Sequence, residues 1–82
     1  MIKATYHAAD QNFADETTIY WFEVEGLDVE GFEFDGLYGV VEGRNAGIVH
    51  DDGAPVLNDY VRDAVERAAE ITDEIRADAA GI

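Results

Sequence analysis

A pentapeptide repeat in the first half of the chain restricts the fold more than any other feature. The segment EVEGLDVEGFEFDGL, residues 23–37, repeats the order acid, apolar, acid, glycine, apolar three times. Side chains on a strand alternate between two faces, so a repeat of five residues moves the acids to the opposite face in each unit. One regular strand therefore cannot keep them on one solvent face. At least one of Gly26 and Gly31 must form a turn or bulge, which predicts a hairpin.

The residues before and after this turn have the composition of strands. The segment TTIYWFEVE combines β-branched and aromatic residues and is the most strand-like part of the chain. Its alternation places Tyr20 and Phe22 on one face and Trp21 on the other. The polar residues 8–16 are interpreted as a loop, and residues 26–31 as the hairpin turn. The expected strands are 2–8, 17–25, 32–41 and 47–50.

From Val56 onward the spacing of apolar residues becomes helical. Pro55 is compatible with a helix start, and Gly81 can end a helix. The order of elements predicts an α+β fold, in which a four-stranded, mainly antiparallel sheet is followed by one long C-terminal helix over 56–79. This helix would pack on one face of the sheet, and the other face would meet solvent or a partner. The expected inner stripe of the helix is Leu57, Tyr60, Val61, Ala64, Val65, Ala68, Ile71 and Ile75.

The length and the cysteine count suggest a small cytoplasmic protein. A chain of 82 residues corresponds to a single domain, 1–82. Because it contains no cysteine, neither a disulfide nor a thiolate metal site can stabilise it. The N-terminal segment MIKATYHAADQN has no apolar stretch long enough for a signal peptide. No apolar run approaches the roughly 20 residues that a membrane span needs.

The charge of the chain narrows the choice of partners. Nineteen acidic residues against five basic residues give a formal net charge of −14. Ten of the acids lie between Ala8 and Gly43, and this span contains no Lys or Arg. Such a charge repels the phosphates of nucleic acids and anionic membranes, so we expect no direct binding to either. It favours a basic partner or a medium of high salt.

The sequence contains little that supports catalysis. It has no Ser and no Cys, so a Ser or Cys nucleophile is excluded. His50, beside Asp51 and Asp52, is the most site-like cluster, and a catalytic alternative would require it to lie in a cleft. We interpret His7 and His50 as ordinary surface residues. The acids also lack the spacing of an EF-hand loop. We therefore expect no enzyme activity, no metal site and no cofactor.

The aromatic run Tyr20-Trp21-Phe22 is interpreted as part of the core. Proteins that stack bases on aromatic rings surround those rings with Lys and Arg, whereas the residues here are acidic. One of the three rings could still serve as an anchor in an interface with a protein.

The acids of the repeat form the candidate binding site. Acids at alternate positions of one strand lie about 6.6 Å apart, and the phosphates of one duplex strand advance by about 3.4 Å per residue. Rows of acids on adjacent strands would therefore present negative charge at a spacing comparable to a nucleic-acid backbone. Lys and Arg clusters of a nucleic-acid-binding protein would accept them. The candidate partner-binding residues are Glu23, Glu25, Asp28, Glu30, Glu33 and Asp35, with Asp51 and Asp52 as an adjoining pair.

In overall character the chain resembles the phage-encoded anti-CRISPR proteins and other DNA mimics. The resemblance rests on EVEGLDVEGFEFDG and on the acids of the predicted helix, and no functional residue carries over position by position. It implies a non-enzymatic inhibitor that occupies the nucleic-acid groove of a partner, such as a Cas effector complex, in the host cytoplasm. Monomer and dimer both stay open. The helix acids are Asp59, Asp63, Glu66, Glu70, Asp73 and Glu74.

The composition also fits a second hypothesis. The segment YVRDAVERAAEITDEIRADAAG is rich in Ala, Asp and Glu and poor in Lys, as haloarchaeal cytosolic proteins are. Under this alternative the protein is a small halophile domain of unknown function, and its acids hold hydration in molar salt. The density of acids between Ala8 and Gly43, with no balancing base, favours the mimic.

The two hypotheses predict different dependence on salt. If the acids serve a partner, the chain should fold at low ionic strength, because its stability does not require screening of the −14 charge. Far-UV circular dichroism with thermal melting, at low salt and in about 3 M KCl, measures this. Folding in molar salt alone would support the salt-adaptation hypothesis instead.

Overall fold

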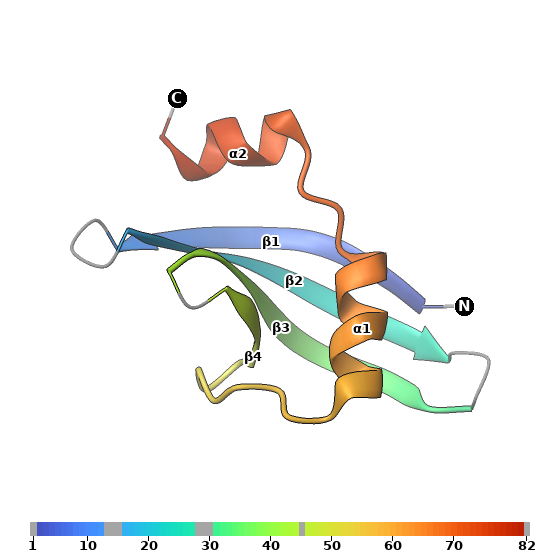
Figure 1. Cartoon of the computed structure of the whole chain (residues 1–82). Coiled ribbons are helices and arrows are strands. Elements are labelled where there is room, and N and C mark those ends of the chain that lie inside the picture. Colours follow the sequence, from blue (N-terminus) through green and yellow to red (C-terminus); the bar gives the residue numbers. More distant parts are fainter. Residues whose placement is uncertain (1, 13–15, 28–30, 45, 82) are drawn as a thin grey trace.

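Four antiparallel strands followed by two short helices form the fold (Figure 1). The computed structural model describes residues 2–12, 16–27, 31–44 and 46–81. The strands lie in the order β1-β2-β3-β4, so each is antiparallel to its neighbour in sequence. This confirms the expected α+β class and the four-stranded sheet. The elements are β1 (Ile2–Asn12), β2 (Thr17–Leu27), β3 (Glu33–Gly43), β4 (Gly47–His50), α1 (Asp59–Ala68) and α2 (Asp73–Ala79).

The hairpin predicted at the repeat is present, but its turn begins later than the expected 26–31, because β2 continues through Gly26 to Leu27. Gly26 has a φ of 115° and Gly31 a φ of 82°, both in the left-handed region that glycine adopts without steric cost. Pairing between β2 and β3 extends to Leu27 opposite Glu33. Residues 28–30 lie outside the described residues. The antiparallel pairing of β2 with β3 places the acids before and after residues 28–30 on the same face of the sheet.

The first strand is longer than the sequence predicted. We expected a strand over 2–8 and a loop from residue 8, but β1 continues to Asn12. The register shifts between Tyr6 and Ala8, and pairing with β2 then resumes as far as Asn12 opposite Thr17. A bulge of this kind inserts an extra residue and changes which residues face the core. The polar residues 10–12 are therefore part of the sheet because β2 supplies their backbone partners.

The prediction of one long helix over 56–79 is wrong. Helix α1 begins at Asp59, where the Asn58 side chain accepts hydrogen bonds from Tyr60 N (2.9 Å) and Val61 N (3.2 Å). It ends before Ala69, whose backbone is extended, and Thr72 caps a separate helix α2. Asn and Thr favour such caps because their side chains bond the unpaired N–H groups of a first turn. The break allows α2 to change direction and contact β1.

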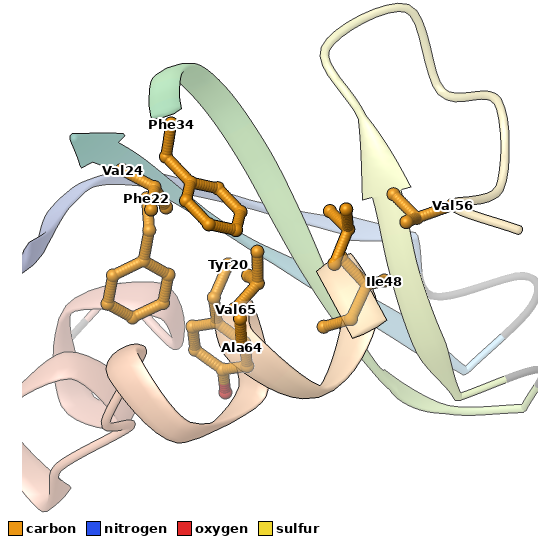
Figure 2. Close-up of a cluster of buried hydrophobic side chains, with 9 residues drawn as sticks. Tyr20, Phe22, Val24, Phe34, Ile48, Val56, Ala64 and Val65 are labelled. Atoms are coloured by element: carbon orange, nitrogen blue, oxygen red, sulfur yellow. The ribbon is translucent and has the colours of Figure 1, made fainter. Parts of the chain in front are cut away.

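The core lies between one face of the sheet and the helices (Figure 2). Tyr20, Phe22 and Val24 of β2 are buried, as the alternation predicted, and in the close-up they lie with Phe34 against α1. Leu57 is 82% exposed, so its assignment to the inner stripe is wrong: it precedes the cap at Asn58 and lies outside the helix. Helix α1 contributes Val61, Ala64 and Val65, and Ile48 and Val56 complete the cluster.

Helix α2 is attached to the sheet by polar contacts at its surface. None of its described residues is buried, although Ile75 and Ala79 pack at the border of the core. Tyr6 Oη on β1 donates a hydrogen bond of 2.6 Å to Asp78 Oδ2. Arg76 donates two hydrogen bonds, of 2.6 and 2.8 Å, to the carboxylate of Glu42 on β3. A bidentate pair of this kind is geometrically specific, so it orients α2 over the sheet.

The contact between Tyr6 and Asp78 should make stability depend on alkaline pH. The hydrogen bond to Asp78, with a smaller effect of burial, raises the pKa of Tyr6 from 10.0 to about 12. The unfolded chain loses this proton first, so the contribution is complete below pH 10 and is lost as the pH rises to about 12. We expect Tyr6→Phe to be less stable than the unmodified protein at pH 8, and the difference to shrink across this window. Urea denaturation at several pH values measures it, and a constant difference would contradict the assignment.

Candidate protein-binding surface

The two helices leave one face of the sheet uncovered. The core residues of β2 face α1, so their neighbours Ile19, Trp21, Glu23 and Glu25 point to the other side. Among the described residues no helix or strand packs over that side, which we call the open face. An antiparallel sheet can expose one face to water in this way.

Four carboxylates lie together at one end of the open face, and we call them the acidic end. The hairpin brings Glu23 and Glu25, at the end of β2, beside Glu33 and Asp35, at the start of β3. Glu25 lies directly opposite Asp35 on one side and opposite Lys3 of β1 on the other. All four side chains are exposed, and none makes a hydrogen bond or ion pair with another described residue. The structure therefore places these four predicted site residues on one surface.

The other predicted acids are placed differently. Asp28 and Glu30 lie outside the described residues. Asp51 and Asp52 follow β4, and both are exposed. The carboxylate of Asp52 accepts a hydrogen bond of 2.9 Å from Ala54 N, so it also closes the turn after β4. The acids of the helices, from Asp59 to Glu74, are exposed on the opposite side of the sheet. One flat partner surface cannot meet both groups.

Beside the acidic end, the open face carries an apolar cluster that we call the apolar platform. It consists of Ile19 and Trp21 of β2, Val49 of β4 and Gly39 between them. A Cβ at Gly39 would lie only 2.7 to 2.9 Å from atoms of these three side chains, so they close directly over the glycine backbone. Trp21 Nε1 donates a hydrogen bond of 2.9 Å to Asp10 Oδ2, which orients the indole.

The expectation that Trp21 packs in the core is wrong. The indole is half buried on the open face, whereas Tyr20 and Phe22 are inside. The alternation of β2 already indicated that Trp21 lies outside the core, because it puts Trp21 on the same face as Glu23. The role that the sequence left open for one aromatic ring, an interface anchor, is compatible with this position.

His50 lies outside the cavity between β4 and α1. Its ring lies 5.8 Å from the ring of Tyr38, and the residue is exposed. A cavity of about 460 Å³ lies between β4 and α1, but its lining, which includes Val49, Leu57 and Arg62, contains neither His50 nor Asp51. No group of three His, Cys, Asp or Glu residues that could hold a metal ion occurs in the described part of the chain.

Comparison with known proteins identifies no relative. The chain matches no family model, no curated protein and no solved structure. Within the described ranges, no helix is long and apolar enough to cross a membrane. The open face and its acidic end are therefore the features from which a function can be inferred.

The pair Glu25 and Asp35 should cost stability. Like charges directly opposite each other on paired strands repel, so we expect Asp35→Asn to stabilise the protein by roughly 0.2–1 kcal/mol. Urea denaturation at low salt measures the change, which should shrink at about 1 M salt. Asp51→Asn, an exposed acid with the same change in net charge, serves as the matched control. An equal gain in the control would mean that only the net charge matters.

Proposed function

We propose that this protein is a non-enzymatic binding protein that occludes a basic nucleic-acid-binding surface of a protein partner, as a DNA mimic. The observation that carries the proposal is the acidic end, where four exposed carboxylates share one uncovered sheet face without a described partner. Lys and Arg side chains of a nucleic-acid groove are the complementary groups.

The arrangement of the acids supports a role in binding rather than in stability. Glu25 has Lys3 of β1 opposite it on one side, but Asp35, opposite Glu25 on the other side, has no described strand beyond it. A cation beside Asp35 would relieve the repulsion between the two acids. The carboxylates repeat along each strand at about 6.6 Å, which is roughly two phosphate steps of about 3.4 Å along a duplex strand. A basic groove could therefore accept both rows.

The apolar platform provides apolar contact area, which the carboxylates of the acidic end do not provide. Interfaces are held mainly by a few well-packed residues, among which Trp is common, and rim charges contribute more to the rate of association. Trp21 is held by its bond to Asp10 and by contact over Gly39. A partner could be attracted by the acidic end and anchored on the platform. By resemblance of type, a Cas effector complex is a candidate partner, and the protein would then be an anti-CRISPR inhibitor.

A second candidate function is favoured by the acids of the helices. They are exposed on the side of the molecule opposite the open face, so acids cover both sides. A hydration surface for molar salt would show this distribution. The dependence of folding on salt separates this candidate from the first.

The proposal predicts competition with nucleic acid. The unmodified protein should displace a fluorescent duplex from a basic partner, tested first on Cas effector complexes by fluorescence anisotropy. The double variant Glu33→Lys with Asp35→Lys should compete at least about tenfold less well, because both carboxylates become repulsive. Both positions are exposed, so the variant should fold.

A matched control is available on the other side of the molecule. The double variant Glu66→Lys with Glu70→Lys changes the net charge equally at exposed positions on the helix side. It should compete like the unmodified protein. Equal losses in the two variants would mean that net charge alone acts, and no loss in the first would exclude the acidic end as the site.

A further inference from the structure

Strand β4 is too short to cover the whole length of β3. Its pairs with β3 run from Val41 opposite Gly47 to Tyr38 opposite His50. Strand β3 begins at Glu33, so residues 33–37 have no described strand on the side away from β2. We call this stretch, Glu33 to Leu37, the open edge.

The hydrogen bonds of β4 show which backbone groups line the open edge. His50 N donates to Ala54 O (2.8 Å), and Val56 N donates to Ile48 O (2.9 Å). Ile48 and His50 therefore direct their backbone groups away from β3, and Val49 between them faces Gly39. The backbone N–H and C=O groups of successive residues in a strand point to alternate sides. Gly39 directs its groups toward β4, so the odd-numbered residues of the open edge direct theirs to the same side of β3. The backbone N–H and C=O groups of Glu33, Asp35 and Leu37 line the edge without a described partner.

The turn after β4 keeps this edge free. Gly53 N donates to His50 O (2.9 Å), and Gly53 has a φ of 88°. The carboxylate of Asp52 bonds Ala54 N. The chain therefore folds back and pairs Pro55 with the outer side of β4, at Val49, instead of continuing along β3. In line with β4, no described strand pairs with the open edge.

The negative charge of the open edge determines which kind of strand can pair with it. Glu33 and Asp35 project onto the open face from this edge. A second copy pairing through the same edge would set carboxylates against carboxylates, and acids on an edge strand are a known means of preventing such pairing. A strand carrying Lys or Arg would instead form opposite-charge pairs. An unpaired edge with acidic side chains therefore favours a basic partner strand over self-association.

The other side of the edge is apolar. Phe34 is buried, and Phe32, which is 43% exposed, lies with its ring centroid 4.9 Å from that of Phe34 and 6.4 Å from that of Tyr60. Residues of an added strand that point toward the helices would meet these rings. The open face beside this edge is acidic and the helix side is apolar. A complementary added strand would therefore alternate basic and apolar side chains.

We propose that the open edge of β3 binds an extended basic segment of the partner as an added strand. Lys or Arg at alternate positions lie opposite Glu33 and Asp35, and apolar residues between them pack near Phe32. Backbone hydrogen bonds supply affinity in this mode of recognition, and the alternating side chains supply specificity. The inference rests on the proposed function and names the part of the partner that the acidic end recognises.

A synthetic peptide tests the inference directly. The probe is acetyl-Thr-Lys-Val-Lys-Val-Lys-Thr-amide, and binding is measured by calorimetry and by amide hydrogen exchange of the full chain. We expect the amides of Asp35 and Leu37 to become protected, because they donate to the added strand. In the expected register the central Lys of the peptide lies opposite Asp35. The N–H of each of these two residues then donates to the C=O of the other, so the N–H of the central Lys must face β3. Backbone N-methylation of that Lys should weaken binding at least about tenfold, since it removes a donor and adds bulk at the edge.

Peptides of equal charge provide the matched controls. N-methylation of one Val alters an N–H that points away from β3, so this peptide should bind more tightly than the one methylated at Lys. A rearranged peptide with three adjacent Lys residues should bind weakly and protect neither amide.

The outcomes separate this inference from the proposed function. Equal binding of the two methylated peptides would show attraction by charge alone and would overturn the added strand, while the displacement assay could still succeed. Failure of the parent peptide to bind would overturn it as well. Protection of Asp35 and Leu37 in the free protein, together with a dimer in solution, would show that a second copy occupies the edge. Tighter binding of the parent with protection of both amides supports the inference.

Discussion

The burial of Tyr20, Phe22 and Val24 beneath α1 is the interaction on which the rest of the structure depends. Because β2 is central, its inner face decides the orientation of both neighbouring strands through the pairs that it makes with them. Alternation then places Trp21, Glu23 and Glu25 on the opposite side, away from both helices. The open face is therefore a consequence of the core, and its acids cannot turn inward without exposing three apolar side chains of β2.

The acidic end, the apolar platform and the open edge occupy connected parts of one sheet. Glu33 and Asp35 belong to both the acidic end and the open edge, and the platform lies further along β2 and β3. The free protein sets Glu25 against Asp35 and leaves backbone groups of β3 without a described partner, which is unfavourable in isolation. A basic strand would relieve both. This coincidence of charge and edge, more than the net charge of −14, is the basis of the proposed binding function.

The parts of the fold that followed from the sequence are those set by local periodicity and by turn chemistry. The hairpin around Gly26 and Gly31 and the buried face of β2 belong to this class, as do the four acids that meet on one face. The length of β1 could not be predicted, since its last residues are polar and are in the sheet only because β2 pairs with them. The break between α1 and α2 was also missed, because the apolar spacing continues across it, although Ala69 is extended and Thr72 caps a new helix.

The sequence by itself determined the class of fold, the excess of negative charge and the face on which the acids of the hairpin lie. All three depend on residue type and on a period of two, which act over a few residues. Only the tertiary structure decided that Trp21 closes over Gly39 and that the helix acids lie on the other side of the molecule. These features depend on contacts between segments far apart in the chain. The open edge exists because the turn at Asp52 and Gly53 directs the chain away from β3.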